Sequence, residues 1–348
     1  MKRPRITVSS RVHRQVFERL RSRSEVVGNR TSEPWTHETL IANARRAHAL
    51  LAFMPDRVDD EVLERCPDLG IVACALKGCD NFDVEACTRR GVWVTVIPDL
   101  LTSPTAELAV GLLIALARNV GAGDRFVRSG AFQGWRPALY GKGLDGSTVG
   151  LLGAGRVGIA VAERLRGFGC ARMLCVDPEP PDTRTRARLG LEVASLDELL
   201  RTSDFIVCAT PLAPGTRHLL DGDALRRVRP GCRLINVGRG SVVDERAVAA
   251  AVADGRLAGY AADVFELEDK ALADRPRSIP RSLLSDRERT LLTPHLGSAV
   301  ADVRLEIEMR AARSILQYLE GDVPDGALNR PLRPRPPPGA GTESVSRG

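Results

Sequence analysis

Lysine is scarce in this chain of 348 residues. Only four of its 50 basic residues are lysine, and the rest are arginine. A lysine kept against such a preference is a candidate for a chemical role. A strong charge imbalance is also missing, because 44 acidic residues are interspersed among the basic ones and leave a net charge of +6. We therefore expect no nucleic acid as a partner.

Long hydrophobic runs and metal-binding cysteine patterns are missing as well. The most apolar stretch, 108–117, is ten residues long, which is too short to span a membrane. The basic N-terminus has no apolar segment of the kind found in signal peptides. The eight cysteines include no C-x-x-C pair and have no histidine at ligand spacing. We expect a cytoplasmic protein with reduced cysteines, no metal and no membrane partner.

The chain contains a regular alternation of short apolar runs and charged helical segments. The strand-like runs of the first hundred residues are 6–8, 49–53, 71–75 and 92–95. A helical stretch over 105–127 precedes a second series, 148–152, 173–176, 205–209, 234–237, 259–263 and 290–293. Strands that alternate with helices predict an α/β protein whose parallel sheets are covered by helices on both faces.

The length of the chain is that of about two domains. We expect residues 1–100 to form the first part of one domain and residues 101–296 to form the other. A helix within 297–330 then returns and completes the first domain. Residues 331–348 are too rich in proline and glycine to pack, and we expect a disordered tail there.

A glycine-rich turn follows the strand-like run 148–152 and opens a helical segment. Gly153, Gly155 and Gly158 stand at the G-x-G-x-x-G spacing. Such glycines allow a tight turn, close approach of the backbone to a pyrophosphate, and close packing of helix against strand. The pyrophosphate would lie at the helix N-terminus, where N–H groups and the helix dipole favour an anion. The pattern predicts a dinucleotide site.

Asp177 stands at the end of the next strand-like run, 19 residues after Gly158. A carboxylate in that place hydrogen-bonds the ribose hydroxyls of NAD. It also repels the additional phosphate of NADP, and no basic residue follows it directly, since Pro178 and Glu179 come next. We therefore expect the cofactor to be NAD rather than NADP.

Three chemically versatile side chains follow three successive strands of the second series. Arg239, Glu268 and His295 each come shortly after a strand-like run. In a parallel sheet the carboxyl ends of the strands share one edge, where ligands bind. Arginine offers a fork of donors to an oxyanion, histidine exchanges a proton near neutral pH, and a carboxylate beside the histidine holds its tautomer. This set suits hydride transfer involving an anionic substrate.

The glycine-rich turn and the segments around these three residues, RGSVVDE, DVFELE and PHLGS, together resemble the D-isomer specific 2-hydroxyacid dehydrogenase family. The resemblance runs from about residue 5 to residue 330. It implies two doubly wound parallel-sheet domains, with a Rossmann NAD-binding domain inserted into a flavodoxin-like substrate domain. It also implies a homodimer, with the helix from Thr105 to about residue 117 as an interface element.

The same resemblance implies a role for each matching residue. Arg239, Glu268 and His295 would be catalytic, and Lys77, Met54 and Arg304 would bind the substrate. The residues expected to bind the cofactor are Lys77, Thr105, Gly153, Gly155, Arg156, Val157, Gly158, Asp177, Ala209, Thr210, Pro211, Val237, Gly238, Asp263, His295, Gly297 and Ser298.

Within the family, several short stretches resemble phosphonate dehydrogenases. They include residues 52–58, 75–83 and 132–135. Phosphite is largely a dianion at neutral pH, and Lys77, Arg239 and Arg304 would supply cations around it. The narrower resemblance implies NAD-dependent oxidation of phosphite to phosphate, with His295 assisting the attack of water and no metal needed.

Two other interpretations stay open. One is a D-2-hydroxyacid dehydrogenase that acts on a small 2-hydroxy or 2-oxo acid of the glyoxylate or hydroxypyruvate type. The other is a dinucleotide-sensing protein like the corepressors built on this fold, which can retain the same three residues.

Overall fold

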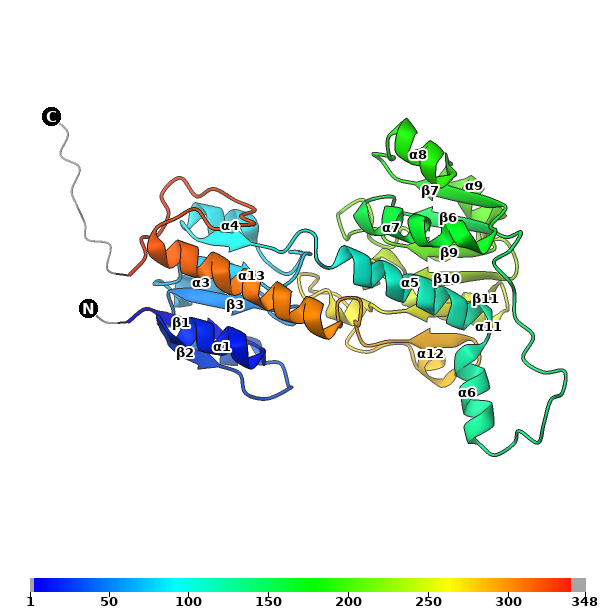
Figure 1. Cartoon of the computed structure of the whole chain (residues 1–348), viewed down its shortest axis with the longest axis horizontal. Coiled ribbons are helices and arrows are strands. Elements are labelled where there is room, and N and C mark those ends of the chain that lie inside the picture. The colour runs from blue at the N-terminus through cyan, green and yellow to red at the C-terminus, as the bar shows by residue number, and fades with distance from the viewer. Residues whose placement is uncertain (1–2, 339–348) are drawn as a thin grey trace. The chain divides into compact units, whose positions relative to one another are not determined.

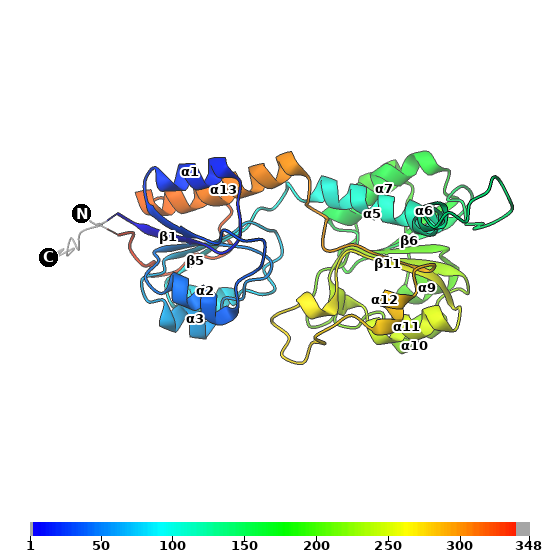
Figure 2. The ribbon, with the colours of Figure 1, turned by 90° about the horizontal axis from the view of Figure 1, so that it is seen from below.

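The computed structural model describes residues 3–338, and the chain divides into two compact units. Unit 1 consists of residues 1–101 and 300–348, and unit 2 consists of residues 102–299. Each unit is a parallel sheet with helices on both of its faces (Figures 1 and 2). The expected α/β architecture is confirmed.

The sheet of unit 1 has five parallel strands in the order β2-β1-β3-β4-β5, which is the flavodoxin order. Its strands are β1 (Arg5–Val8), β2 (Glu25–Gly28), β3 (Ala49–Ala52), β4 (Ile71–Cys74) and β5 (Trp93–Thr95). Strands β3 and β4 are buried throughout because helices cover both of their faces. The short strand β2 at the sheet edge was not expected from the sequence.

Two helical layers enclose this sheet. One face packs against α1 (Arg14–Arg21) and α13 (Ala301–Glu320), and α13 brings the chain back from unit 2. The other face packs against α2 (His37–Ala44), α3 (Asp60–Arg65) and α4 (Val84–Arg89). Figure 2 shows these helices on opposite sides of the sheet. Thr36, Asp59 and Asp83 cap the N-termini of α2, α3 and α4 through their side chains.

The sheet of unit 2 has seven parallel strands in the order β12-β11-β10-β9-β6-β7-β8. These strands are β6 (Thr148–Leu152), β7 (Arg172–Val176), β8 (Leu191–Val193), β9 (Phe205–Cys208), β10 (Cys232–Asn236), β11 (Leu257–Ala262) and β12 (Thr290–Leu292). The chain reverses its direction of travel across the sheet between β6 and β9, as in a Rossmann fold. The glycine-rich turn lies at this switch point.

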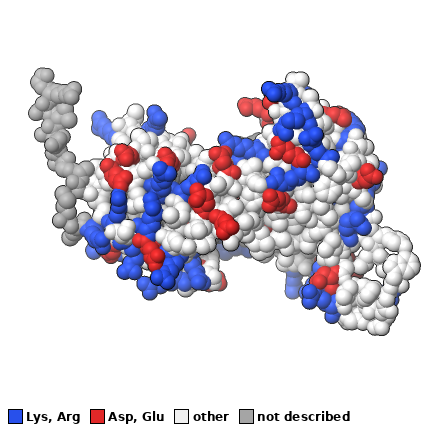
Figure 3. All heavy atoms as spheres, viewed as in Figure 1, with Lys and Arg blue, Asp and Glu red and all other residues white. Residues whose placement is uncertain are grey.

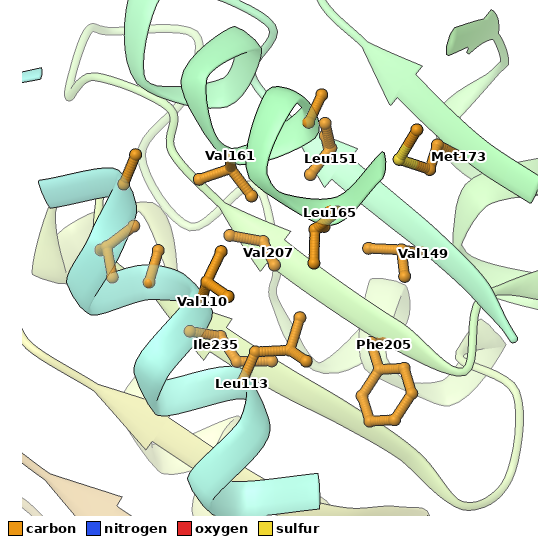
Figure 4. Close-up of a cluster of buried hydrophobic side chains, with 14 of the residues drawn as sticks. Val110, Leu113, Val149, Leu151, Val161, Leu165, Met173, Phe205, Val207 and Ile235 are labelled. Carbon is orange, nitrogen blue, oxygen red and sulfur yellow. The ribbon is translucent and has the colours of Figure 1, made fainter. Parts of the chain in front are cut away.

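Helices cover both faces of the second sheet as well. The helices of this unit are α5 (Thr102–Ala117), α6 (Val120–Arg128), α7 (Arg156–Leu165), α8 (Thr183–Leu189), α9 (Leu196–Thr202), α10 (Gly222–Arg227), α11 (Glu245–Ala253) and α12 (Arg281–Ser285). Short 3-10 turns are η1 (Arg166–Phe168), η2 (Gly240–Val242) and η3 (Glu266–Glu268). Apolar side chains of α5 and α7 interlock with those of the central strands, among them Leu113, Leu165 and Phe205 (Figure 4).

The expected continuous helix over 105–127 is wrong, because α5 and α6 are separate. Asn119 lies between them in the left-handed region at φ 53°, which interrupts the helical hydrogen bonds. The apolar residues of α5 are buried in the core of its own unit.

Within residues 3–338 no single helix is long and apolar enough to cross a membrane. Within these residues, one bent pair of helices, α5 and α6, reaches that length and apolar composition together, with an angle of 62° between the two helices.

Residues 118–141, which we call the arm, belong to unit 2 but contain no buried residue. The arm contains α6 and ends next to its starting point, where the Lys142 N–H donates to the Ala117 carbonyl at 2.8 Å. Gly141 is needed there because a Cβ would lie 2.1 Å from the Ala117 oxygen. Apolar side chains of the arm face solvent, and Trp135 is 86% exposed.

The residues after 330 begin as an ordered segment rather than as a disordered tail. The Arg335 guanidinium donates to the carbonyls of Cys66 and Leu69 at 3.2 and 2.8 Å and to that of Arg90 at 2.9 Å. Tyr318 donates from its hydroxyl to the Arg335 carbonyl at 3.2 Å. The expectation of disorder is therefore wrong for residues 331–338, because arginine satisfies carbonyls left open at the ends of α3 and α4. The remaining residues of that expected tail, 339–348, lie outside the described residues.

Arg335→Ala should lower the free energy of unfolding of the protein by about 1–3 kcal/mol, because it removes hydrogen bonds from a charged donor to three carbonyls. Urea unfolding followed by circular dichroism measures this change. Arg333→Ala is the matched control, since Arg333 is exposed and lies in the same segment. Equal stability of the two variants would show that the Arg335 contacts contribute nothing.

Candidate functional site

The functional residues expected in unit 2 lie at one edge of its sheet. Each follows the carboxyl end of a strand: Gly153 follows β6, Asp177 follows β7, Ala209 to Pro211 follow β9, Val237 to Arg239 follow β10, Asp263 follows β11, and His295 follows β12. All of these strands are parallel, so their carboxyl ends share an edge. The structure thus brings this group of residues together.

The three glycines of the turn meet different surroundings. Gly153 has φ +93°, and a Cβ there would lie 3.0 Å from the backbone of Ala209 and Thr210. A Cβ on Gly158 would lie 2.1 Å from the Gly153 carbonyl oxygen. Gly155 is the N-cap of α7, is exposed, and would have no atom within 4 Å of an added Cβ. Only Gly155 therefore borders open space, at a helix N-terminus able to accept an anion.

Asp177 is tied to the glycine-rich turn. Its carboxylate accepts the Ala154 N–H at 2.7 Å and the Glu179 N–H at 2.9 Å. These bonds hold the carboxylate at the end of β7, beside the turn. The arrangement fits a dinucleotide, with the pyrophosphate against the Gly155 backbone and the ribose hydroxyls at Asp177. Arg156 and Val157, at the start of α7, flank the same space.

The loop that carries His295 is organised by one buried carboxylate. Asp263 is 2% exposed and accepts from the Thr293 hydroxyl at 2.6 Å, the Leu296 N–H at 2.7 Å and the Gly297 N–H at 2.8 Å. The His295 N–H donates to the Asp263 carbonyl at 2.9 Å. His295 has φ 56°, an unusual conformation for a residue other than glycine, and these four bonds hold it there.

His295 and Glu268 form the pair that the sequence predicted. The His295 Nδ1 lies 2.6 Å from the Glu268 Oε2, and the other carboxylate oxygen accepts the Phe265 N–H at 2.7 Å. With Nδ1–H bound to the carboxylate, Nε2 becomes the nitrogen that exchanges a proton. Both side chains are about a quarter exposed, so a substrate can reach them.

Arg239 follows β10 and precedes the turn η2. Its backbone carbonyl accepts from the Asn236 side chain at 3.0 Å, and the Gly238 N–H donates to the same amide group at 3.1 Å. Gly240 permits a close approach to the next segment, because a Cβ would lie 1.9 Å from the Phe265 carbonyl carbon. The Arg239 segment is therefore packed directly against the segment that carries Glu268. The fully buried Asn236, which sequence analysis missed, helps to set this geometry.

The other expected contacts of the cofactor lie around this edge. The Thr105 hydroxyl donates to the Gly297 carbonyl at 3.3 Å, and the Thr210 hydroxyl donates to the Leu152 carbonyl at 2.9 Å. Gly238 passes close to Thr210, since a Cβ would lie 2.5 Å from the Thr210 carbonyl oxygen. Ser298 follows Gly297 and is half-buried.

The expected residues Met54, Lys77 and Arg304 belong to unit 1 and lie at its own sheet edge. Met54 follows β3 and Lys77 follows β4, which is the neighbouring strand. Arg304, on α13, donates to the Ala75 carbonyl at 3.3 Å and lies 5.8 Å from the Phe53 ring centroid. The structure therefore groups these three residues. Burial lowers the pKa of Arg304, although a guanidinium stays charged at any physiological pH.

Two buried carboxylates, both missed by sequence analysis, support this edge. Asp56 is 5% exposed and accepts the Phe53 N–H at 2.7 Å and the Ser9 hydroxyl, and burial raises its pKa to about 6. Glu308 lies 3.6 Å from the Arg304 guanidinium and 2.8 Å from the His13 ring. An acidic residue shortly after an apolar strand was the only signal for Asp56 in the sequence.

The two units carry different functional groups at the carboxyl ends of their strands. Unit 2 provides a dinucleotide cradle, an arginine and a histidine–carboxylate pair. Unit 1 provides a lysine and a partly buried arginine, which can bind an anion. A histidine that moves a proton beside a hydride carrier is what the interconversion of an alcohol and a carbonyl requires.

Comparison with known proteins agrees with this chemistry. Residues 110–297 match the NAD binding domain of D-isomer specific 2-hydroxyacid dehydrogenases. The glyoxylate reductase of Aeropyrum pernix is 38% identical over 95% of this chain and 97% of its own length. A crystal structure of a Thermus thermophilus protein has a TM-score of 0.83 at 34% identity and covers 93% of this chain and 100% of its own.

A further solved structure is that of an NADPH-dependent glyoxylate/hydroxypyruvate reductase from Sinorhizobium meliloti, in complex with NADP and malonate. It has a TM-score of 0.81 at 30% identity, over 96% of this chain and 99% of its own.

The interpretation of the chain as a phosphite-oxidising enzyme is wrong. Relatives that are 34–38% identical over most of the chain are glyoxylate reductases, and phosphonate dehydrogenase finds no support among the relatives. That interpretation depended on short stretches, such as 52–58 and 75–83, and on the cations in and near them. Lysine and arginine bind a carboxylate as readily as a phosphite dianion, so these residues do not distinguish the two substrates.

Gly155→Ala should impair ligand binding, whereas Gly158→Ala should impair the stability of the protein. Gly155→Ala should weaken NADH binding by about tenfold, because a methyl group blocks close approach of the pyrophosphate, while the melting temperature stays unchanged. Gly158→Ala should cost about 1–3 kcal/mol of stability, because its Cβ collides with the Gly153 carbonyl. NADH fluorescence titration and thermal unfolding measure the two effects.

Gly167→Ala is the matched control for both variants, since Gly167 lies in the same unit with no atom within 4 Å of an added Cβ. Unaltered NADH binding in Gly155→Ala would place the pyrophosphate elsewhere.

Proposed function

The chain belongs to the D-isomer specific 2-hydroxyacid dehydrogenase family, and on that basis we propose that it reduces glyoxylate, or a similarly small 2-oxo acid, to the 2-hydroxy acid with NADH. The observation that carries the proposal is the Glu268–His295 pair at the sheet edge that also bears the dinucleotide cradle. The glyoxylate reductases among the relatives support the choice of substrate.

When bound at the Gly155 turn, NADH would supply a hydride to the carbonyl carbon of the substrate. His295 donates the proton that the carbonyl oxygen takes up, from Nε2, while Glu268 stabilises the imidazolium through Nδ1. Arg239 presents its guanidinium to the substrate carboxylate and carbonyl, which orients the substrate and polarises the bond under attack. One hydride and one proton added to a 2-oxo acid give the 2-hydroxy acid, so the reaction balances.

Lys77 and Arg304 are the proposed anion-binding residues of unit 1, and Met54 contributes an apolar contact. Support comes from the position of Lys77 and Met54 after neighbouring strands and from the contact of Arg304 with the Ala75 carbonyl. A carboxylate paired with cations in a partly buried place gains charge-assisted hydrogen bonds.

NAD is the proposed preferred form of the cofactor. Asp177 holds a negative charge beside the place of the adenine ribose, where the additional phosphate of NADP would be repelled. The Sinorhizobium meliloti relative is NADPH-dependent, so the family accommodates both cofactors. The carboxylate of Asp177 is the feature of this chain that favours NAD.

A homodimer is also part of the proposal, with the arm as its contact surface. The interface helix expected from the sequence was α5, but its apolar residues are buried within unit 2. The arm instead exposes Val127, Phe132, Trp135 and Tyr140, and Figure 3 shows it as a largely uncharged projection at the lower right. Exposed apolar side chains of this kind gathered in one segment favour association.

Purified protein should oxidise NADH when glyoxylate is added, with a higher kcat/KM than with NADPH, and should form no NADH from phosphite and NAD. His295→Asn should lower kcat by about 10²–10⁴-fold and leave NADH binding intact, because it removes only the proton donor. Absorbance at the NADH band measures all of these rates. His48→Asn is the control, since His48 directly precedes β3 and so lies at the opposite, amino end of the strands of unit 1. Rapid turnover of phosphite, or none of glyoxylate, would refute the proposal.

Wild-type protein should sediment at about twice its chain mass of 37.7 kDa. Trp135→Ser combined with Phe132→Ser should shift it toward the monomer, because both side chains would lose the apolar burial that a partner provides. Leu332→Ser is the control, since Leu332 is 98% exposed but lies outside the arm. A dimer that survives the double substitution would place the interface elsewhere.

A further inference from the structure

Two buried glutamates in unit 2 hold each other's backbone. The Glu245 N–H donates to the Glu266 Oε1 at 2.9 Å, and the Glu266 N–H donates to the Glu245 Oε1 at 2.9 Å. Glu245 is 1% exposed and Glu266 is 6% exposed. We call this reciprocal pair, Glu245 and Glu266, the carboxylate bracket. It joins the start of α11 to the start of η3, which are 21 residues apart in the chain.

Further bonds connect the bracket to its surroundings. The remaining Glu266 oxygen, Oε2, lies 2.9 Å from the His218 Nε2. The His218 N–H donates to the Ser241 carbonyl at 2.7 Å, and the Ser241 N–H donates to the Asp269 carboxylate at 2.8 Å. Three separate chain segments thus converge on the bracket. His218 adopts φ 49°, a conformation that a histidine keeps only when its surroundings enforce it.

The bracket lies next to the proposed catalytic residues in the sequence and in space. Arg239 begins the segment that leads through η2 to Glu245, and Glu268 ends the turn that Glu266 begins. Between them, Gly240 touches the Phe265 carbonyl group so closely that no Cβ fits. The two bracket glutamates therefore link the segment that bears Arg239 to the segment that bears Glu268.

On the side of η3, the charged groups around Glu245 are all carboxylates. Burial, and after it the charges of Glu266, Glu268 and Asp269, raise the pKa of Glu245 to about 7, against the lowering effect of the bond from the Glu266 N–H. The other titratable groups beside the bracket are His218, at Glu266, and Tyr260 on β11, whose own pKa burial and Glu245 raise. An uncharged Glu245 is thus favoured below neutral pH, and an ionised one adds a negative charge beside the Glu266 carboxylate.

We infer that Glu245 and Glu266 are positioning residues for the proposed reduction, and that ionisation of Glu245 loosens the seating of Arg239 against Glu268. This rests on the proposed function for its catalytic readout. Neither glutamate needs to touch substrate or cofactor. Their effect passes through the backbone of η2 and η3, and so it reaches the orientation of the substrate and of His295.

Glu245→Gln tests the inference, because glutamine keeps the acceptor for the Glu266 N–H but cannot ionise. At pH 6 the variant should have nearly the wild-type kcat/KM for glyoxylate. From pH 6 to pH 9 the ratio of variant to wild-type kcat/KM should rise by about threefold or more, the effect of a weak coupling between neighbouring groups. Most of this change should come from KM for glyoxylate. The KM of the wild type should increase with pH more than that of the variant, since Arg239 is the group displaced. Profiles that stay parallel over this range would overturn the inference.

Asp223→Asn is the matched control. Asp223 also lies in the first turn of a helix of unit 2, α10, but its side chain is 75% exposed. Its pH profile should follow the wild type throughout. A rise equal to that of Glu245→Gln would show that the effect is a general one of surface charge and would overturn the inference.

A second measurement needs no substrate. The native state holds the Glu245 proton up to about pH 7, whereas an unfolded glutamate releases it near its ordinary pKa of 4.5. Wild-type stability therefore falls as the pH rises through this window, and Glu245→Gln lacks that fall. The melting temperature of the variant should rise relative to wild type between pH 5 and pH 8. Over the same range the hydrogen-exchange protection factors at residues 239–242, which correct for the intrinsic pH dependence of amide exchange, should fall only in the wild type.

The two readouts separate the two possible failures. If the wild type does not reduce glyoxylate, the proposed function fails, and the melting and exchange data still decide on the bracket. If Glu245→Gln melts far below wild type at pH 5, the protection factors of the wild type at residues 239–242, followed from pH 5 to pH 8, decide on the bracket without the variant. Protection factors at residues 239–242 that stay constant with pH in the wild type would overturn the inference.

Discussion

Every strand in both sheets runs parallel to its neighbours, and the candidate site depends on that constraint. A parallel sheet must end all its strands at one edge, so residues that are far apart in sequence, such as Asp177, Arg239 and His295, leave the sheet on the same side. Burial on both faces keeps these strands in place. The loops that follow the strands therefore begin at fixed positions.

Buried carboxylates give those loops their shape. Asp263 gathers the turn around His295, Glu268 accepts a backbone N–H as well as the histidine, and Glu245 and Glu266 bind each other's amides. In unit 1, Asp56 does the same for the backbone of Phe53. A buried carboxylate is costly unless it accepts hydrogen bonds, and a loop with open N–H groups is costly unless they are bound. When the carboxylate accepts the N–H groups of the loop, both costs are avoided, and the loop is held in one conformation.

Much of this could be predicted from the sequence. The alternation of apolar runs and helices indicated parallel sheets, the glycine spacing indicated the cradle, and the pairing of Glu268 with His295 followed from the resemblance to a family. The short edge strands β2 and β8 escaped notice because three or four residues with partly exposed faces carry little pattern. The break at Asn119 escaped because apolar periodicity continues through it, whereas its left-handed conformation is a property of the backbone.

The sequence by itself determined the fold class and the position of a glycine-rich turn, a glutamate and a histidine after strands of one sheet, because each is encoded in local spacing and residue type. Only the tertiary structure decided which side chains hold these residues in place. Asn236, Asp56 and the carboxylate bracket act through hydrogen bonds between segments that are distant in the chain, and local patterns do not encode such partners. The same holds for Arg335, whose partners are carbonyls more than two hundred residues earlier. Long-range polar contacts form only after the sheets have brought their segments together.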